Sequence, residues 1–482
     1  MVRGLSMATQ APLAERWYAT TWRWHFYAGL FTAPFILWLS ITGGIYLFKP
    51  QIEAWLDRPY DALAIQGPAA APSTLARAAQ EAVPGAVLHR YILPAEPDDA
   101  QRVVVGIGAE ETRLYLHPQT GEVLHRVGED DRLMMVIFLL HGELMGGRWG
   151  SALVELAASW AIVLLLSGLF LWWPRTNGLA GVLWPRLDKG RRIRWRDLHA
   201  VTGFWVSLAA IFLIFSGLPW AKNWGGYLQA VREATGQVSG PVDWSQGSDH
   251  EREARAALDA RSRAALGSHY GSGSIEHHGH GAVAATQAVE GGVGAATPDM
   301  LLQLDRVVPS VARLGLAGPV EITPPVHPGS SVWQVASEAA NRPKRATAEV
   351  DGTDGRVIGR VDFAQRHWID RAVGYGVAIH EGAFFGWPNQ VLGLLVVSAL
   401  ALLSISAVVL WWRRRPHGRL GAPPVQGRLR HSWALVALTV LLAFVVPLFG
   451  ISLALVVAAE HLVLRRCVRA SRFLGLRGVG AP

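Results

Sequence analysis

Five long apolar runs, separated by polar segments, dominate the hydrophobic pattern of this chain. Each approaches or exceeds the roughly 20 residues that an α-helix needs to cross the hydrocarbon core of a bilayer. They cover residues 26–48, 152–173, 201–220, 391–412 and 433–457. The pattern predicts a membrane all-α bundle of about five transmembrane helices. A hydrophobic content of 51% and 21 tryptophans among 482 residues agree with this class.

Two of the polar segments carry the alternating pattern of small folded domains. Residues 73–82 have helical periodicity, and 86–93, 102–107, 113–116 and 122–125 alternate as strands do. A second unit of this kind is expected at 298–363, where residues 347–357 echo 114–123. We therefore expect two small α+β domains outside the bundle. The stretch 236–297, rich in Gly, Ala, Ser and His, is predicted to be a largely irregular insertion.

The order of segments repeats. Residues 22–175 and 196–415 each contain a long helix, an α+β unit, a short helix with a histidine, another long helix, a tryptophan pair and an arginine. Two repeats of one polarity predict a two-fold internal repeat about an axis along the membrane normal.

This pattern predicts boundaries for every segment of the chain. In order they are a cytoplasmic tail at 1–20; a first span at 21–49; a first external domain at 50–130; a short helix and second span at 131–175; a basic loop at 176–195; a third span at 196–220; a second external domain at 221–368 containing the insertion; a short helix and fourth span at 369–413; a basic loop at 414–430; a fifth span at 431–464; and a basic tail at 465–482. We expect the fifth span to cross once, with a re-entrant hairpin as the alternative.

The distribution of charge predicts the orientation. The formal net charge is +8, and residues 174–198 carry seven Arg or Lys against two acids, whereas 50–131 carry 13 acids against six Arg. By the positive-inside rule the basic loops and the N-terminus are cytoplasmic, and the α+β domains lie outside. The basic balance is thus explained by topology, and no nucleic-acid partner is expected. With a single cysteine, Cys467, the chain has no intramolecular disulfide.

Histidines occupy matching positions in the two repeats. His25 and His199 each begin an apolar run, with Gly29 and Gly203 four residues later. His141 and His380 form a second matching set. Each lies at the end of a predicted short helix, just before a break that contains glycine. Ionisable side chains at membrane depth are costly and therefore mark functional sites.

A two-fold axis would bring each of these pairs face to face. Two facing imidazoles between helices are the axial ligands of a six-coordinate haem. We therefore expect two b-type haems, held by His25 with His199 and by His141 with His380, one near each membrane face. Gly29 and Gly203 would leave room for the porphyrin edge, or would equally serve as close helix contacts. No side chain is expected to act as a catalytic group of its own.

Other candidates have a weaker basis. His431 and His461 are reserve ligands, and surface positions are expected for His89, His117, His125 and His327. The cluster at 269–281 (His269, His277, His278, His280) lies among glycines and favours an irregular or loosely metal-binding loop. Arg23, Arg132 and Arg371 are candidates for pairing with haem carboxylates. A P-loop, a dinucleotide fingerprint, a nucleophile elbow and an HExxH helix are all absent from the sequence.

The order of motifs resembles that of the PepSY-associated transmembrane proteins, which include iron-regulated inner-membrane proteins and dihaem ferrisiderophore reductases of Gram-negative bacteria. The motifs that carry the resemblance are His25-Phe-Tyr-Ala-Gly29 with Thr42-Gly43, the hairpin from Leu116 to Leu124, His141 with Ser167-Gly168 and Trp172-Trp173-Pro174, His199-Ala-Val-Thr-Gly203, and His380. The resemblance implies a multi-pass protein of the bacterial inner membrane with periplasmic PepSY domains. For the reductase branch it also implies bis-histidine haems and electron delivery to ferric siderophores.

The expected function is therefore the reduction of a ferric siderophore or other ferric chelate in the periplasm, with release of Fe²⁺. The electron donor would be a cytoplasmic protein or membrane quinol, and lipid would surround the spans. Two alternatives remain open: a non-catalytic PepSY membrane protein that binds or regulates a periplasmic partner such as a protease, and a metal or chelate transporter. The spans lack the broken-helix carboxylate site that would favour a transporter.

Overall fold

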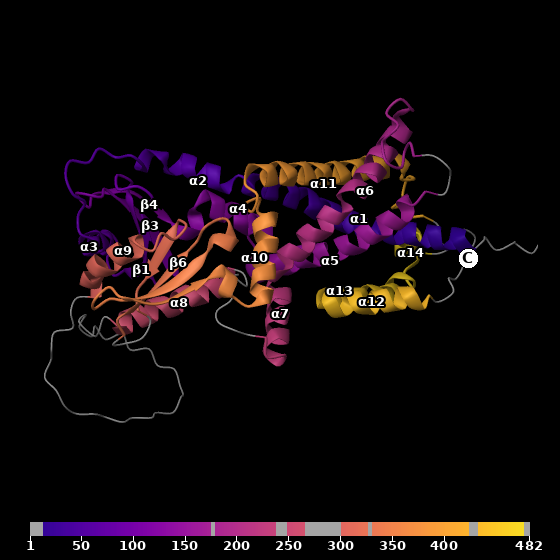
Figure 1. Cartoon of the computed structure of the whole chain (residues 1–482). Helices are drawn as coiled ribbons and strands as arrows, with labels where there is room; N and C mark the ends of the chain where they lie inside the picture. Colours follow the sequence, from indigo (N-terminus) through magenta and orange to yellow (C-terminus); the bar gives the residue numbers. More distant parts are fainter. Residues whose placement is uncertain are drawn as a thin grey trace, which may run out of the picture. The chain divides into compact units, whose positions relative to one another are not determined.

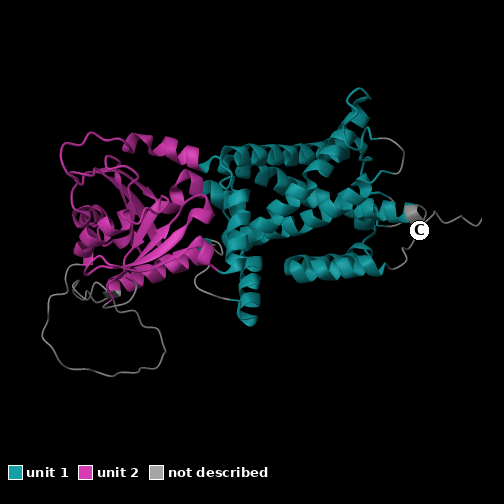
Figure 2. Ribbon diagram, in the orientation of Figure 1, with its two compact units in different colours: residues 1–49, 136–249, 367–482 teal, residues 50–135, 250–366 magenta. Residues whose placement is uncertain are grey.

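The computed structural model describes residues 13–174, 179–237, 248–265, 300–325, 330–423 and 432–476. The chain forms two compact units (Figure 2). The helical unit comprises residues 1–49, 136–249 and 367–482, and the sheet unit comprises 50–135 and 250–366.

Four long helices form the core of the helical unit (Figure 1). They are α1 (Leu13–Tyr46), α5 (Gly147–Trp172), α6 (Arg191–Gly217) and α11 (Trp387–Arg414). Both α1 and α6 pack against α5 and α11, so α1 and α6 face each other across the diagonal of a closed ring. Five helices in the described residues are long and apolar enough to cross a membrane. They are Glu15–Tyr46, Gly147–Trp172, Arg191–Trp220, Trp387–Arg414 and Pro447–Leu464. The predicted helical membrane bundle is confirmed at this level.

The first span is longer than predicted. Residues 13–20, expected to belong to a cytoplasmic tail, already lie in α1. No glycine or proline occurs from Leu13 to Ala28, so nothing in the local sequence stops the helix there. Residues 1–12 lie outside the described part of the chain.

Two short helices precede α5 and α11, as the sequence predicts. They are α4 (Leu133–Gly142), which carries His141, and α10 (Trp368–His380). Sharp turns follow both helices: Leu144 and Met145 have φ of 50° and 57°, and Gly382 and Gly386 have φ of 77° and 66°. These turns let the chain change direction before α5 and α11 begin.

The region predicted to cross the membrane once, 431–464, is not one continuous helix in the structure. This region contains α12 (Trp433–Val445) and α13 (Pro447–Ala459), separated at Val446. A Cβ placed on Gly450 would lie 2.8 Å from the Cβ of Ala443, although residues seven apart in one helix are separated by about 10 Å. Leu474 and Gly475, farther along the chain, accept hydrogen bonds from Tyr27 and Arg23 near the start of α1. The segment is therefore a helical hairpin, in which Pro447 supplies the break because it cannot donate a helical hydrogen bond.

One further helix of this unit, α7 (Lys222–Ala234), is anchored to α10 by a buried ion pair. Arg232 donates to both carboxylate oxygens of Asp370, at 2.9 and 3.0 Å. Asp370 lies in the first turn of α10 and His380 at its last residue. The ion pair therefore fixes the start of the helix that carries His380.

A single antiparallel sheet of eight strands forms the sheet unit, with the order β4-β3-β2-β1-β5-β6-β7-β8. The strands are β1 (Val87–Leu93), β2 (Gln101–Ile107), β3 (Glu110–Leu116), β4 (Val123–Gly128), β5 (Val320–Thr323), β6 (Val332–Ser337), β7 (Ala346–Asp351) and β8 (Val357–Asp362). The predicted strands of the first half agree with these within a few residues.

The expectation of two separate α+β domains needs correction. The two four-stranded halves join through β1 and β5, where Tyr91 is paired with Ile322. Two separate sheets would each leave that strand as an edge with unpaired backbone groups, and the pairing removes both edges. Equivalent turns close the outer hairpins, with Gly121 at φ 71° and Gly355 at φ 75°.

Helices α3 (Pro72–Ala82) and α9 (Leu304–Ala312) cover one face of the sheet and complete a continuous apolar core. Both are amphipathic, and their buried faces include Leu75, Ala79, Leu304 and Val307.

The stretch predicted to be a largely irregular insertion contains a helix, α8 (Ser248–Ala265). Its sequence is rich in Ala, Arg and Glu, which favour helices. The remaining parts, 238–247 and 266–299, lie outside the described residues.

The remaining elements are short. They are α2 (Lys49–Asp57), α14 (Val468–Leu474), the 3₁₀ turns η1 (Arg58–Tyr60), η2 (Glu129–Asp131), η3 (Leu218–Trp220), η4 (Met300–Gln303), η5 (Arg342–Lys344) and η6 (Phe363–Gln365), and the π-helical turn η7 (Glu460–Leu464).

Candidate functional site

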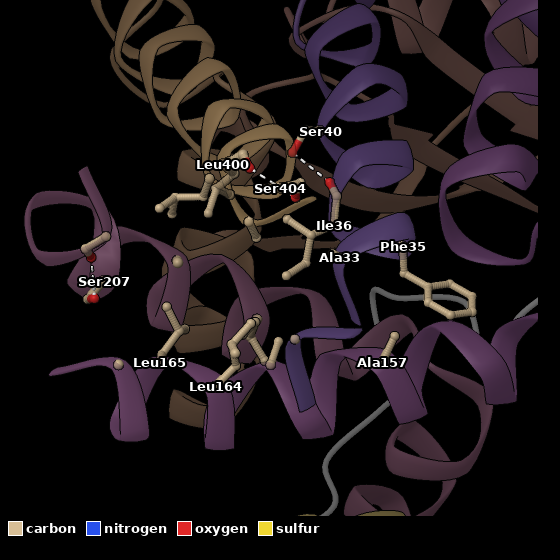
Figure 3. A pocket seen from close by; sticks show the side chains of 18 of the residues that line it. Ala33, Phe35, Ile36, Ser40, Ala157, Leu164, Leu165, Ser207, Leu400 and Ser404 are labelled. Carbon is tan, nitrogen blue, oxygen red and sulfur yellow. Dashed lines mark hydrogen bonds between the residues drawn. The ribbon is translucent and has the colours of Figure 1, made fainter. Parts of the chain in front are cut away.

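A cavity of about 1290 Å³ lies inside the ring of α1, α5, α6 and α11. Pockets for small ligands usually hold about 300–1,000 Å³, so this one has room for more than one such molecule or a very large one. Aliphatic and small side chains line its middle, including Ala33, Ala157, Leu164 and Leu165 (Figure 3). All four histidines that the sequence singled out also line it: His25, His141, His199 and His380.

His25 of α1 and His199 of α6 form the first histidine pair. Their ring centres lie 6.3 Å apart, with the ring planes at 82°. With metal–imidazole bonds of about 2.0–2.1 Å, and a ring centre roughly 1.1–1.2 Å from Nε2, a metal shared by two imidazoles needs ring centres about 6.4 Å apart. The first pair therefore has the spacing of two axial ligands. Because each ring can rotate about its own Nε2–metal axis, the perpendicular planes are compatible with this arrangement.

The Nδ1 atoms of this pair are engaged by neighbouring helices. His25 Nδ1 lies 3.1 Å from Ser167 Oγ and 3.1 Å from the carbonyl oxygen of Leu164, both on α5. His199 Nδ1 lies 3.0 Å from Ser406 Oγ on α11. With Nδ1 engaged, Nε2 is the nitrogen left for a ligand in the cavity.

His141 of α4 and His380 of α10 form the second histidine pair. His141 Nδ1 lies 2.9 Å from Thr42 Oγ1 on α1, and His380 Nδ1 lies 2.9 Å from Ser216 Oγ on α6. Both side chains line the same cavity as the first pair. The tertiary structure thus brings together two histidines from two short helices that are 239 residues apart in sequence.

Glycines lie directly against three of the four rings. A Cβ on Gly168 would be 3.1 Å from His25 Cε1, one on Gly43 would be 3.0 Å from His141 Cε1, and one on Gly217 would be 3.4 Å from His380 Cε1. None of these three glycines was predicted to lie against an imidazole. The signal that could have found all three is a hydroxyl residue immediately before the glycine: Thr42, Ser167 or Ser216.

Gly29 and Gly203 line the cavity but also lie at close helix contacts. A Cβ on Gly29 would be 3.4 Å from Leu164 Cδ1, and one on Gly203 would be 3.5 Å from Leu403 Cδ2. Both uses suggested by the sequence are therefore compatible with their positions.

The three arginines proposed to pair with haem carboxylates do not line the cavity. Arg23 donates to the carbonyl oxygens of Pro423 and Gly475, and Arg132 pairs with Glu53 and Glu129 in the sheet unit. Arg371, on α10, is likewise not among the lining residues. The arginines that do line it are Arg186, Arg196 and Arg414. Arg186 and Arg196 both bind the buried carboxylate of Asp197, whereas the guanidinium of Arg414 stacks over the ring of Trp22 at 5.5 Å.

The other histidines lie elsewhere or outside the described residues. The reserve candidate His461 is exposed, and its Nδ1 donates to Val457 of its own helix. His431, His327 and the cluster at 269–281 are not described. Within the described ranges, His, Cys, Asp and Glu side chains form no group of three or more that could hold a metal ion. The two histidine pairs are therefore the site candidates that remain.

The expectation that His89 is a surface residue is wrong. Its side chain is fully buried against the sheet, 2.8 Å from Glu111 Oε1 and 3.5 Å from Asp259 Oδ1 of α8. The alternation of apolar and polar residues did not predict that His89 is buried, because a bulge in β1 lies between Leu88 and Arg90.

An ionic network surrounds His89 in the sheet unit. Burial opposes ionisation of Glu129, but the nearby guanidinium groups of Arg113, Arg90 and Arg132 outweigh it and lower the pKa of this carboxyl to about 2. Burial, together with the carboxylate of Asp57, raises the pKa of Tyr115 to about 12. Arg90 pairs with Glu111 and Arg113 with Glu129, whereas His89 Nε2 and Arg90 Nε lack a hydrogen-bond partner among the described residues. The ion pairs make the network a structural element of this unit.

Comparison with protein families gives one match. The model of the PepSY-associated TM region matches residues 22–414 of this chain. A search of curated proteins finds no match.

Proposed function

Because the chain belongs to the PepSY-associated transmembrane family, we propose that it is a dihaem membrane reductase that delivers electrons to a ferric siderophore or another ferric chelate. The alternative is a non-catalytic member of the family that binds or regulates a partner such as a periplasmic protease.

One observation carries the proposal: the ring centres of His25 and His199 are 6.3 Å apart inside a large cavity. Packed aromatic rings commonly lie about 4.5–7 Å apart, so this separation points to a shared ligand because both imidazoles also line the cavity and both have Nδ1 engaged by a neighbouring helix. In the second pair, each histidine lies near the end of a short helix at the matching place in its repeat. Each Nδ1 lies within hydrogen-bond distance of a hydroxyl oxygen, as in the first pair. We therefore assign the second haem to this pair. His25, His199, His141 and His380 are the proposed axial ligands.

Haem held by two imidazoles supplies reversible one-electron transfer. The chain itself supplies orientation and exclusion of water. Its aliphatic lining, which includes Ala161, Leu164 and Leu213, would exclude water from around the haems. Arg414 lies where it can meet an anionic edge of a ligand at the His25 end of the cavity.

The proposed reaction on the substrate is the addition of one electron to Fe³⁺ to give Fe²⁺. Oxygen donors hold the more highly charged Fe³⁺ more tightly, so reduction releases the metal from its chelator. The electron would come from a cytoplasmic donor or from membrane quinol.

The proposed location is the bacterial inner membrane. The positive loops and the N-terminus would face the cytoplasm, and the sheet unit would lie in the periplasm, where its halves act as PepSY-like domains. Lipid would cover the exposed apolar side chains of the helical unit, such as Trp433 and Leu208. The mirrored strand order about β1 and β5 supports the two-fold repeat.

Optical spectroscopy of the purified full chain tests this function. We expect about two haems per chain, with the split α and β bands of bis-histidine cytochromes after reduction. Mixing the reduced protein with a ferric chelate should reoxidise it and yield Fe²⁺ that a ferrous-specific dye traps. A colourless, iron-free protein prepared from haem-replete cells would overturn the proposal and favour the alternative.

A further inference from the structure

A short sequence pattern occurs on each of the four core helices, and on each helix one copy contacts a different histidine. The pattern is Leu-x-x-Ser/Thr-Gly/Ala. The copies that contact histidines are 39–43 on α1, 164–168 on α5, 213–217 on α6 and 403–407 on α11, whereas a second copy on α11, 395–399, has an exposed serine. Their hydroxyls bond to His141, His25, His380 and His199, in that order.

Each of these hydroxyls also lies within hydrogen-bond distance of a carbonyl oxygen of its own helix. The distances are 3.0 Å from Thr42 to Trp38, 3.1 Å from Ser167 to Leu164, 2.8 Å from Ser216 to Phe212 and 2.9 Å from Ser406 to Leu403. A hydroxyl has only one proton to donate, and a carbonyl can only accept. A hydroxyl that donates to its carbonyl accepts its other hydrogen bond from the imidazole, so that Nδ1 carries the proton. His25 Nδ1 also lies 3.1 Å from the carbonyl oxygen of Leu164, which can only accept.

We propose that Thr42, Ser167, Ser216 and Ser406 are positioning residues that hold the four imidazoles in the Nδ1–H tautomer, with Nε2 turned toward the cavity. The assignment of these imidazoles as haem ligands rests on the proposed function; the tautomer does not. A metal-binding histidine usually donates its second N–H to an acceptor that fixes the ring and raises its basicity. Here the acceptor is a hydroxyl whose own proton is tied to the backbone.

The last residue of the pattern complements the hydroxyl. In three copies it is glycine, and a Cβ there would approach the imidazole Cε1 at 3.0 to 3.4 Å. The fourth copy has Ala407 in place of the glycine. The pattern therefore provides one polar contact and one flat surface for the ring.

Hydroxyls bonded to their own helix are common in membrane helices, so a control set is needed. The chain provides one, because Ser40 and Ser404 stand two residues before Thr42 and Ser406. Both line the cavity and donate to their own helices, at Ile36 and Leu400 (Figure 3). Within the described residues, these two serines bond to the backbone of their own helix but not to a histidine. Substituting them therefore tests the loss of the backbone hydrogen bond separately from the loss of the contact with an imidazole.

The sharpest test uses the isosteric change Thr42→Val in the full chain, because Thr42 is the hydroxyl partner of His141. The control is Ser40→Ala and the rescue is Thr42→Ser. The readout is the ¹⁵N–¹H spectrum of histidine-labelled protein under reducing conditions, in which low-spin Fe²⁺ is diamagnetic. The unmodified chain should show four buried Nδ1–H signals that exchange slowly with water.

In Thr42→Val we expect the His141 signal to exchange at least tenfold faster or to vanish, and haem affinity at the second pair to fall about 10- to 100-fold. Ser40→Ala should leave both unchanged, and Thr42→Ser should restore both. An unaltered His141 signal in Thr42→Val, or an equal loss in Ser40→Ala, would overturn the inference. If the signal behaves as expected in a protein without haem, the positioning role stands and the proposed function fails.

Discussion

The helical unit and the sheet unit differ in how their interiors are filled. In the sheet unit, 20 buried side chains form one continuous apolar core from Leu75 to Val350. In the helical unit the corresponding cluster has four, Ile162, Leu218, Val446 and Phe449, and the centre of the ring is a cavity of about 1290 Å³. Protein interiors are normally packed as densely as organic crystals. The sheet unit therefore has a packed apolar core of its own, whereas the helical unit encloses a cavity, which under the proposed function holds the haems.

The largest effect should come from removing one of the histidines proposed to hold haem. His199→Ala leaves His25 without a partner at the first pair, and His380→Ala does the same to His141 at the second. Each substitution should remove about one haem and leave the other, as measured by absorbance against protein concentration. His461→Ala, on an exposed side chain, is the matched control and should keep the full haem content. Loss of both haems from each single variant would show that the two sites depend on each other.

Removing the proposed haems should affect the stability of the helical unit but not that of the sheet unit. Haem-depleted protein should lose amide protection in α1, α5, α6 and α11, because the cavity lining then has no partner atoms. The strands of the sheet unit should keep their protection. Hydrogen exchange followed by mass spectrometry measures both in one sample. Equal loss in both units would contradict the comparison.

A substitution in the core of the sheet unit should destabilise that unit and leave the haem content unchanged. Trp333 is fully buried, and its Nε1 donates to Gln303 at 2.8 Å. Trp333→Ala should destabilise the sheet unit by about 3–5 kcal/mol, the usual cost of truncating a buried aromatic side chain. Opening free energies from hydrogen exchange would report this. The haem absorbance should not change, and a loss of haem would show that the helical unit depends on this core.

Acid should weaken the sheet unit through Glu129. Its pKa in the folded state, about 2, is below the ordinary value of 4.5, so its contribution is complete above about pH 4.5 and is lost as the pH falls toward 2. The loss should be at most about 3 kcal/mol, since one pKa unit corresponds to about 1.4 kcal/mol. Opening free energies of β3 and β4 measured between pH 5 and 2 provide the test. Glu129→Gln should flatten this profile, and an unchanged slope would contradict it.

The smallest effects are expected at Gly29 and Gly203. A new methyl group would meet Leu164 or Leu403 at 3.4–3.5 Å, an ordinary van der Waals contact, while alanine gains up to about 1 kcal/mol of helix propensity. Gly29→Ala and Gly203→Ala should therefore leave haem content and thermal stability nearly unchanged. A clear loss of haem in either variant would support their direct contact with the porphyrin edge.

Much of the architecture could be predicted because it is local. Hydrophobic length identified the first four spans, and period-two alternation identified β1 to β4 within a few residues. The spacing of His25 and His199 within the repeats, together with the breaks after His141 and His380, predicted the four cavity histidines. These features depend on near neighbours in sequence, which strongly influence helix and strand formation.

Other features depended on contacts between distant segments. The hairpin of α12 and α13 is apolar throughout, so its hydrophobicity matches that of a single span. Contacts between segments reveal the reversal, because Gly450 packs against Ala443 and residues 474 and 475 accept hydrogen bonds from the start of α1. The burial of His89 follows from a bulge in β1 and from α8, which is 170 residues beyond it at Asp259. The hydroxyl partners were missed because serine and threonine occur throughout the spans, and only tertiary structure distinguishes Thr42 from Ser40.

By itself the sequence determined the membrane class, the repeated order of elements and the four histidines, because periodicity, helix breaks and the cost of burying an ionisable group are properties of single segments. Only the tertiary structure decided that the two α+β halves share one sheet, since strand edges pair wherever they meet. It alone also set the 6.3 Å separation of His25 and His199, because the diagonal of a helix ring depends on how all four helices pack.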